Sequence, residues 1–149
     1  MAGIPFPRVI PFARLIGFEL LRFADGEAEI AIEVREELSN SWGVAHGGMM
    51  MTLLDVCMAH AARAPLTGAA PVEDRGAVTI EMKTSFLKPG LGRLVARGSV
   101  LRRSPSLLFC EGRIVDAEGE LVAHATGTFK VLRGLPVGGR RVHSPDASD

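Results

Sequence analysis

One long apolar run, residues 47–62, limits most strongly what this chain can fold into. Its composition favours a helix that begins at a pair of glycines and carries very few charges. Such a helix must be covered on most of its sides. The extended segments on either side of it can form that cover as one antiparallel sheet that curls around the helix. The outer face and the edges of the sheet would then need covering too, which favours a dimer or a larger assembly.

Two extended segments precede this helix and four follow it. In residues 27–34 apolar positions alternate with Glu27, Glu29 and Glu33, as expected for a half-buried antiparallel strand. The other expected elements are strands at 17–23, 77–87, 93–102, 107–116 and 121–132, a short helix at 11–16, and loops at 35–45 and 68–76. We therefore predict an α+β fold, with one domain over residues 1–133 and a flexible tail over 134–149.

Charge balance and cysteine content narrow the function and the location. Seventeen basic and seventeen acidic side chains cancel, so no overall field would attract nucleic acid or an anionic membrane. The chain has no apolar run of about 18 residues that could span a membrane, and residues 1–11 lack the pattern of a signal peptide. Cys57 and Cys110 lie in apolar surroundings without metal-ligand spacing. We expect two buried free thiols in a reducing cytoplasm, and neither a metal nor a cofactor.

The candidate chemistry lies in the loop before the helix and in one carboxylate within it. Gly47 and Gly48 at the helix entrance offer backbone N–H groups to an incoming oxygen, and the helix dipole adds positive potential there. Asp55 lies deep in the apolar helix, where a charge costs free energy unless it is paired, hydrogen-bonded or protonated. Structural interpretations compete with these. His46 can be an N-terminal cap, Asn40 a turn residue or loop anchor, and the glycines sites of close packing.

The spacing along the helix separates the glycines from the carboxylate. Gly47 and Asp55 are eight residues apart, which corresponds to roughly 12 Å along one helix. An oxyanion donor and a general base must each come within about 3 Å of the same reacting centre. One helix cannot meet both requirements. Either the two features are unrelated, or Asp55 of one subunit faces Gly47 of another, as in two antiparallel helices across a twofold axis.

Together these residues resemble a known family signature. The pattern Asn40-x-x-Gly43-x-x-His46-Gly47-Gly48, followed by Thr52-Leu-Leu-Asp55, is similar to that of the hotdog-fold thioesterases of the phenylacetate-pathway (PaaI) type. Segments 76–90 and 116–128 resemble the same family, and the resemblance covers about residues 15–133. It implies a curved antiparallel sheet of about six strands wrapped around one long central helix. It also implies dimers that usually pair into tetramers.

The resemblance also implies an activity, the hydrolysis of an acyl-CoA with an aromatic or medium-chain acyl group. The Gly47 N–H would polarise the thioester carbonyl, and His46 and Asn40 would shape and support that end of the site. Asp55 of the neighbouring subunit would activate water or attack directly. Thr79 would orient the water or the carboxylate, although by itself it can also be an ordinary strand residue.

Substrate-binding residues are expected at the helix entrance and in the segment 101–106. Arg102 and Arg103 could meet the phosphates of CoA, or could be solvated loop charges. They belong to Leu101-Arg-Arg-Ser-Pro-Ser106, a segment in which the family commonly has a glycine instead. The candidates at the helix entrance, which can equally be core residues, are Gly48, Met49 and Thr52, with Met50, Met51 and Met58 as further candidates for an acyl pocket.

Two other functions fit parts of the same pattern. A hotdog hydratase or dehydratase would act on enoyl or hydroxyacyl thioesters, but it generally pairs a His with an acid in a spacing different from that of His46 and Asp55. A non-catalytic acyl-CoA-binding module would gain nothing evident from a buried carboxylate beside a thioester. Asp55 therefore favours an enzyme.

Overall fold

The structure, a computed structural model, describes residues 2–69, 76–132, 135–137 and 140–142. The main elements, in chain order, are α1 (Pro11–Ile16), β1 (Glu19–Ala24), β2 (Glu27–Glu33), a single 3-10 turn (Glu36–Leu38), α2 (Gly47–Arg63), β3 (Gly76–Phe86), β4 (Arg93–Arg103), β5 (Leu108–Val115) and β6 (Leu121–Leu132). These confirm the predicted elements to within a few residues. Most of the loop expected at 68–76, namely residues 70–75, lies outside the described residues.

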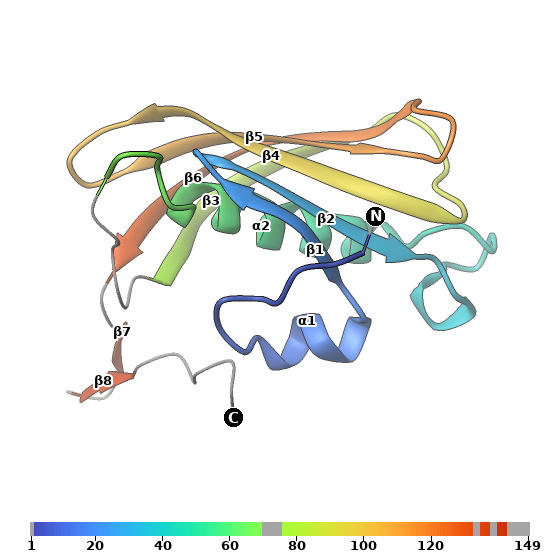
Figure 1. Cartoon of the computed structure of the whole chain (residues 1–149). Coiled ribbons are helices and arrows are strands. Elements are labelled where there is room, and N and C mark those ends of the chain that lie inside the picture. The colour runs from blue at the N-terminus through green and yellow to red at the C-terminus, as the bar shows by residue number, and fades with distance from the viewer. Residues whose placement is uncertain (1, 70–75, 133–134, 138–139, 143–149) are drawn as a thin grey trace.

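Six of the strands form one antiparallel sheet in the order β1-β2-β4-β5-β6-β3. The sheet curves around α2, which lies along its concave side (Figure 1). This arrangement confirms the predicted α+β hotdog fold. Among the described strands, β1 and β3 are the edges of the sheet.

The buried face of α2 lies unusually close to the sheet. Leu54, Cys57 and Met58 on that face are fully buried. Glycines on β4 and β5 leave room for this approach: a Cβ at Gly98 would lie 3.1 Å from the Cys57 carbonyl oxygen, and one at Gly112 would lie 3.1 Å from side-chain atoms of Leu54 and Met58. Both distances are tighter than ordinary packing. The sheet therefore fixes the position of the helix closely.

Both cysteines are free and buried, as predicted. The Cys57 thiol donates to the backbone oxygen of Ala28 over 3.3 Å. Burial raises the pKa of Cys57 strongly and that of Cys110 to about 11. Thiols with such raised pKa values remain protonated at neutral pH and are poor nucleophiles. The two cysteines therefore belong to the packing of the core and not to the chemistry.

The opposite face of α2 is not covered by the sheet. Met51, Asp55, Val56 and Ala59 on this face are only partly buried. A helix face that is left open beside an edge strand can be covered by a second copy of the chain.

Within the part of the chain that the structure describes, no helix is long and apolar enough to cross a membrane.

The C-terminal segment holds structure that the sequence analysis did not predict. Strands β7 (Leu135–Val137) and β8 (Arg140–Val142) form a short antiparallel hairpin. The predicted flexible tail at 134–149 otherwise falls largely outside the described residues. Its mobility remains a prediction.

Candidate active site

His46 caps the N-terminus of α2, which confirms the capping interpretation of this residue. Its Nδ1 accepts a hydrogen bond from the Gly48 N–H at 2.9 Å. A neutral His46 in this arrangement carries its proton on Nε2. Gly48 is tightly placed, since a Cβ there would lie only 3.0 Å from His46 Nδ1. The N–H of Gly47 has no hydrogen-bond partner among the described residues and remains available as a donor.

Asn40 organises the loop that leads to this cap. Its side-chain oxygen accepts from the N–H groups of Trp42 at 2.9 Å and Val44 at 3.4 Å. Gly43 at the turn has φ +76°, a conformation that favours glycine. Trp42 is 87% exposed beside it. Asn40 is therefore the loop anchor that the sequence analysis considered, and it supports the Gly47 end of α2 through the backbone.

Asp55 and Thr79 form the second group of candidate residues. The Thr79 hydroxyl donates to Asp55 Oδ1 at 2.5 Å. Thr79 lies on β3, on the side of the strand that faces α2. The prediction that Asp55 is buried deep in the fold is wrong for the single chain: the carboxylate is partly exposed, because it lies on the helix face that the sheet leaves open. The expected hydrogen-bond partner is present.

The two groups lie apart within one chain. Gly47 and His46 stand at the start of α2, whereas Asp55 follows about two helical turns later. None of the hydrogen bonds found among the described residues connects Asp55 or Thr79 to Asn40, His46 or Gly47. One chain therefore contains two separate groups of candidate residues, one with a backbone donor and one with a carboxylate.

Most of the predicted substrate-binding residues on α2 have structural roles. Met49 is 7% exposed and belongs to the core, which fits the structural interpretation, and its contact with substrate stays a prediction. Met50 and Met58 are core residues as well, and only Met51 is partly exposed. The Thr52 hydroxyl donates to the Gly48 carbonyl at 2.9 Å within the helix.

Arg102 and Arg103 lie at the other end of the helix. Both are exposed at the end of β4. Arg103 Nη1 donates to the carbonyl oxygen of Ala62 at 3.3 Å, in the last turn of α2, where a cation complements the helix dipole. Within one chain these arginines are therefore remote from Gly47 and lie beyond Asp55.

Phe86 is a site residue that the sequence analysis did not single out. A Cβ at Gly47 would lie 3.5 Å from the nearest atoms of the Phe86 ring, so the ring packs beside the start of α2. The pairing of β3 with β6 shifts between Thr79 and Glu81, which makes Ile80 the extra residue of a β-bulge. The bulge places Thr79 and Phe86, seven residues apart, on the same side of β3. Regular alternation would place them on opposite sides.

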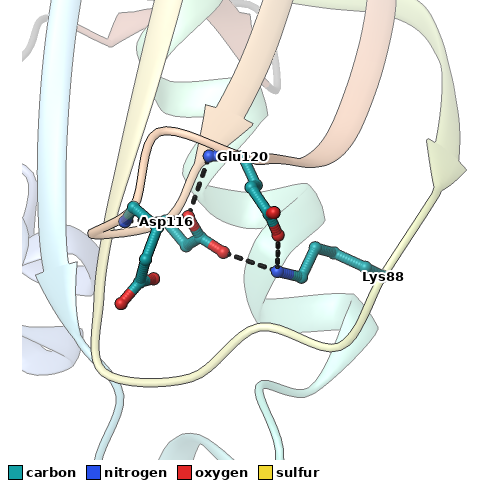
Figure 2. A network of polar contacts seen from close by, with 4 residues as sticks. Lys88, Asp116 and Glu120 are labelled. Atoms are coloured by element: carbon teal, nitrogen blue, oxygen red, sulfur yellow. Dashed lines mark hydrogen bonds and ion pairs between the residues drawn. The ribbon is translucent and has the colours of Figure 1, made fainter.

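A polar network fixes the chain just after Phe86. Lys88 Nζ donates to Asp116 Oδ2 at 2.8 Å and also to Glu120, so the loop after β3 is bound to the turn between β5 and β6 (Figure 2). The hydrogen bond from Lys88 lowers the pKa of Asp116, and the two carboxylates raise the pKa of Lys88. This network holds the end of β3 in place beside Gly47.

Comparison with known proteins identifies the family. The model of the thioesterase superfamily matches residues 43–123, more than half of the chain. The chain belongs to this superfamily. It is accordingly a thioester hydrolase with a hotdog fold, as the PaaI-type resemblance implied.

Individual relatives agree with this assignment. A protein of Saccharolobus solfataricus with a provisional esterase name is 30% identical over 129 residues, which cover 86% of this chain and 88% of the relative. The medium/long-chain acyl-CoA thioesterase YigI of Escherichia coli is 26% identical over 142 residues, which cover 88% of this chain and 92% of YigI. A mutant of the phenylacetic acid degradation protein PaaI from Thermus thermophilus superposes with a TM-score of 0.71 at 33% identity, and the match covers 83% of this chain and all of PaaI.

Proposed function

We propose that this thioesterase hydrolyses an acyl-CoA, with an aromatic or medium-chain acyl group, to the free acid and CoA. The observation that carries the proposal is the hydrogen bond from Thr79 to Asp55 on the open face of α2. It orients a solvent-accessible carboxylate, which a general base or a nucleophile requires. The name of the relative YigI supports an acyl-CoA with a medium or long chain, and that of PaaI supports an aromatic acid.

The proposed reaction uses both groups of residues, each as one half of the site. The thioester carbonyl oxygen accepts a hydrogen bond from the Gly47 N–H, and the helix dipole favours the negative charge that develops on it. If Asp55 acts as base, it takes a proton from a water molecule whose oxygen attacks the carbonyl carbon. Collapse of the tetrahedral intermediate breaks the C–S bond and releases the CoA thiolate. If Asp55 acts as nucleophile, it forms a mixed anhydride that water then hydrolyses.

The proposal requires two subunits for each site. The carboxylate and the free N–H are separated by about 12 Å along α2, too far to serve one carbonyl. The open face of α2 is adjacent to the edge of β3 that has no partner among the described strands, so a second copy that joins along β3 would cover both. We propose a homodimer in which Asp55 of one subunit faces Gly47 of the other, and a homotetramer made of two such dimers in the cytoplasm. Arg102 and Arg103 would then lie on the Asp55 side, where they could meet CoA phosphates.

A thiol-release assay tests the proposal. We expect Asp55→Asn to lower kcat about 10²–10⁴-fold on the best of a series of aromatic and straight-chain acyl-CoAs, because the variant loses the basic group and keeps the side-chain size. Glu37→Gln, which neutralises an exposed carboxylate of the 3-10 turn, is the matched control and should retain activity. Near-native turnover by a folded Asp55→Asn variant would rule out the assigned role. Hydration of crotonyl-CoA without release of thiol would instead favour a hydratase.

A further inference from the structure

Phe86 presents an open aromatic surface beside the proposed oxyanion donor. One part of its ring packs beside Gly47, at 3.5 Å from the position of a Cβ there. The side chain nevertheless remains 49% exposed. An aromatic ring that is half packed and half open at the end of an edge strand presents apolar surface to a group bound beside it.

The position of this ring is well defined. The ring lies beside the first residue of a helix that the sheet holds closely. Just after it, the backbone N–H groups of Leu87 and Lys88 both donate to the Val122 carbonyl, at 2.8 and 3.2 Å. The ion pairs of Lys88 hold the same loop (Figure 2). Phe86 can therefore act as a fixed wall rather than as a mobile surface side chain.

The neighbours of Gly47 differ in character. The exposed His46 and the loop anchored by Asn40 precede it in the chain, whereas the ring of Phe86 packs beside it. A thioester whose carbonyl reaches the Gly47 N–H has an apolar acyl group on one side of its carbonyl carbon and the polar amide arm of CoA on the other. Burial of apolar surface favours placing the acyl group against Phe86, with the polar CoA arm directed away from the ring.

We propose that Phe86 is a specificity-determining residue that contacts the acyl group of the substrate and favours apolar, and above all aromatic, acyl groups. The proposal rests on the proposed function, because it takes the Gly47 N–H as the donor to the thioester carbonyl. It adds the residue that selects the acyl group.

The test compares kcat/KM for acetyl-, hexanoyl- and phenylacetyl-CoA in the wild type and in Phe86→Ala. Removal of the ring should lower kcat/KM about 10–100-fold for the hexanoyl and phenylacetyl substrates, because both lose apolar contact area. Acetyl-CoA, which has almost no acyl chain, should change by less than about threefold. Phe86→Leu keeps most of the apolar volume and loses only the aromatic pairing. It should therefore lower kcat/KM for phenylacetyl-CoA about three- to tenfold more than kcat/KM for hexanoyl-CoA.

Phe12→Ala is the matched control, because Phe12 is a phenylalanine with similar exposure, 56%, on α1. It should leave all three values unchanged. An equal loss on all three substrates, or no loss on any, would overturn the assignment of Phe86 while leaving the thioesterase activity in place. A wild-type protein inactive on every acyl-CoA would overturn the proposed function and this assignment with it. Size-exclusion chromatography and urea unfolding verify that both Phe86 variants assemble and fold like the wild type.

Discussion

Asp55 and His60 lie little more than one turn apart on α2 and have opposite surroundings. Asp55 faces the open side and accepts from Thr79. His60 is only 1% exposed. Its Nδ1 donates to the Val56 carbonyl at 2.7 Å, and its Nε2 accepts from Arg63 at 3.1 Å. Burial, with the positive charge of Arg63 as the second cause, lowers the pKa of His60 to about 4. A histidine this buried belongs to the packing of the helix and not to the reaction.

The lowered pKa of His60 predicts how stability depends on pH. Below about pH 6.5 the unfolded chain binds a proton at this residue, whereas the folded chain does not until about pH 4. Stability should therefore fall as the pH drops through this window, by up to about 3 kcal/mol for the whole shift. Urea unfolding between pH 7 and 4 measures the loss. NMR of the imidazole nitrogens should show a neutral His60 at pH 5.5, and a half-protonated ring near pH 6.5 would contradict the account.

Several residue roles could be predicted from the sequence because they depend on local chemistry. The cap at His46, the loop anchor at Asn40 and the free buried thiols are of this kind. The exposure of Asp55 could not be predicted in the same way. The helix is apolar on nearly every side, so its sequence does not show which side the sheet leaves open.

At the scale of the elements, β3 carries Thr79 and Phe86, and the side to which each points depends on one inserted residue. Strand boundaries could be predicted because turn residues separate the extended segments. The bulge at Ile80 could not, because nothing in the alternation of residues 76–86 marks an unpaired position. The sequence therefore gives no indication that Thr79 and Phe86 share one side of the strand.

The exposed edge of β3 leads to a prediction about assembly. Ile80 is 55% exposed on this edge strand, and the proposed dimer joins along it. Ile80→Asp should place a charge in that junction, shift the protein toward monomer and lower activity at least tenfold, because each site then lacks its second subunit. Multi-angle light scattering combined with the thiol assay measures both effects.

Leu101→Asp is the matched control for this edge. Leu101 is 59% exposed and is also the extra residue of a bulge, but it lies on β4, an interior strand of the sheet. The Leu101→Asp protein should keep the oligomeric state and the thioesterase activity of the wild type. A dimeric, active Ile80→Asp protein would show that the subunits do not join along β3.

At the scale of the whole molecule, the sheet order β1-β2-β4-β5-β6-β3 brings the last strand of the sheet beside the first strand after the helix. Periodicity predicts strands but not their neighbours, so the prediction of a curled sheet depended on the apolar helix and on the family resemblance. The separation of Gly47 from Asp55, in contrast, could be predicted from helix geometry alone, because the two positions are eight residues apart on α2, and the proposal of two subunits for each site builds on it.

The central claim is that each active site combines Asp55 of one subunit with the Gly47 end of another. Subunit exchange between an inactive Asp55→Ala protein and an inactive Asn40→Ala protein tests it directly. Random pairing makes half of the dimers mixed, and each mixed dimer has one intact site out of two, so about one quarter of the wild-type thioesterase activity should return. Confirmed exchange without any recovery of activity would contradict the shared site, because it would mean that both residues act within the same chain.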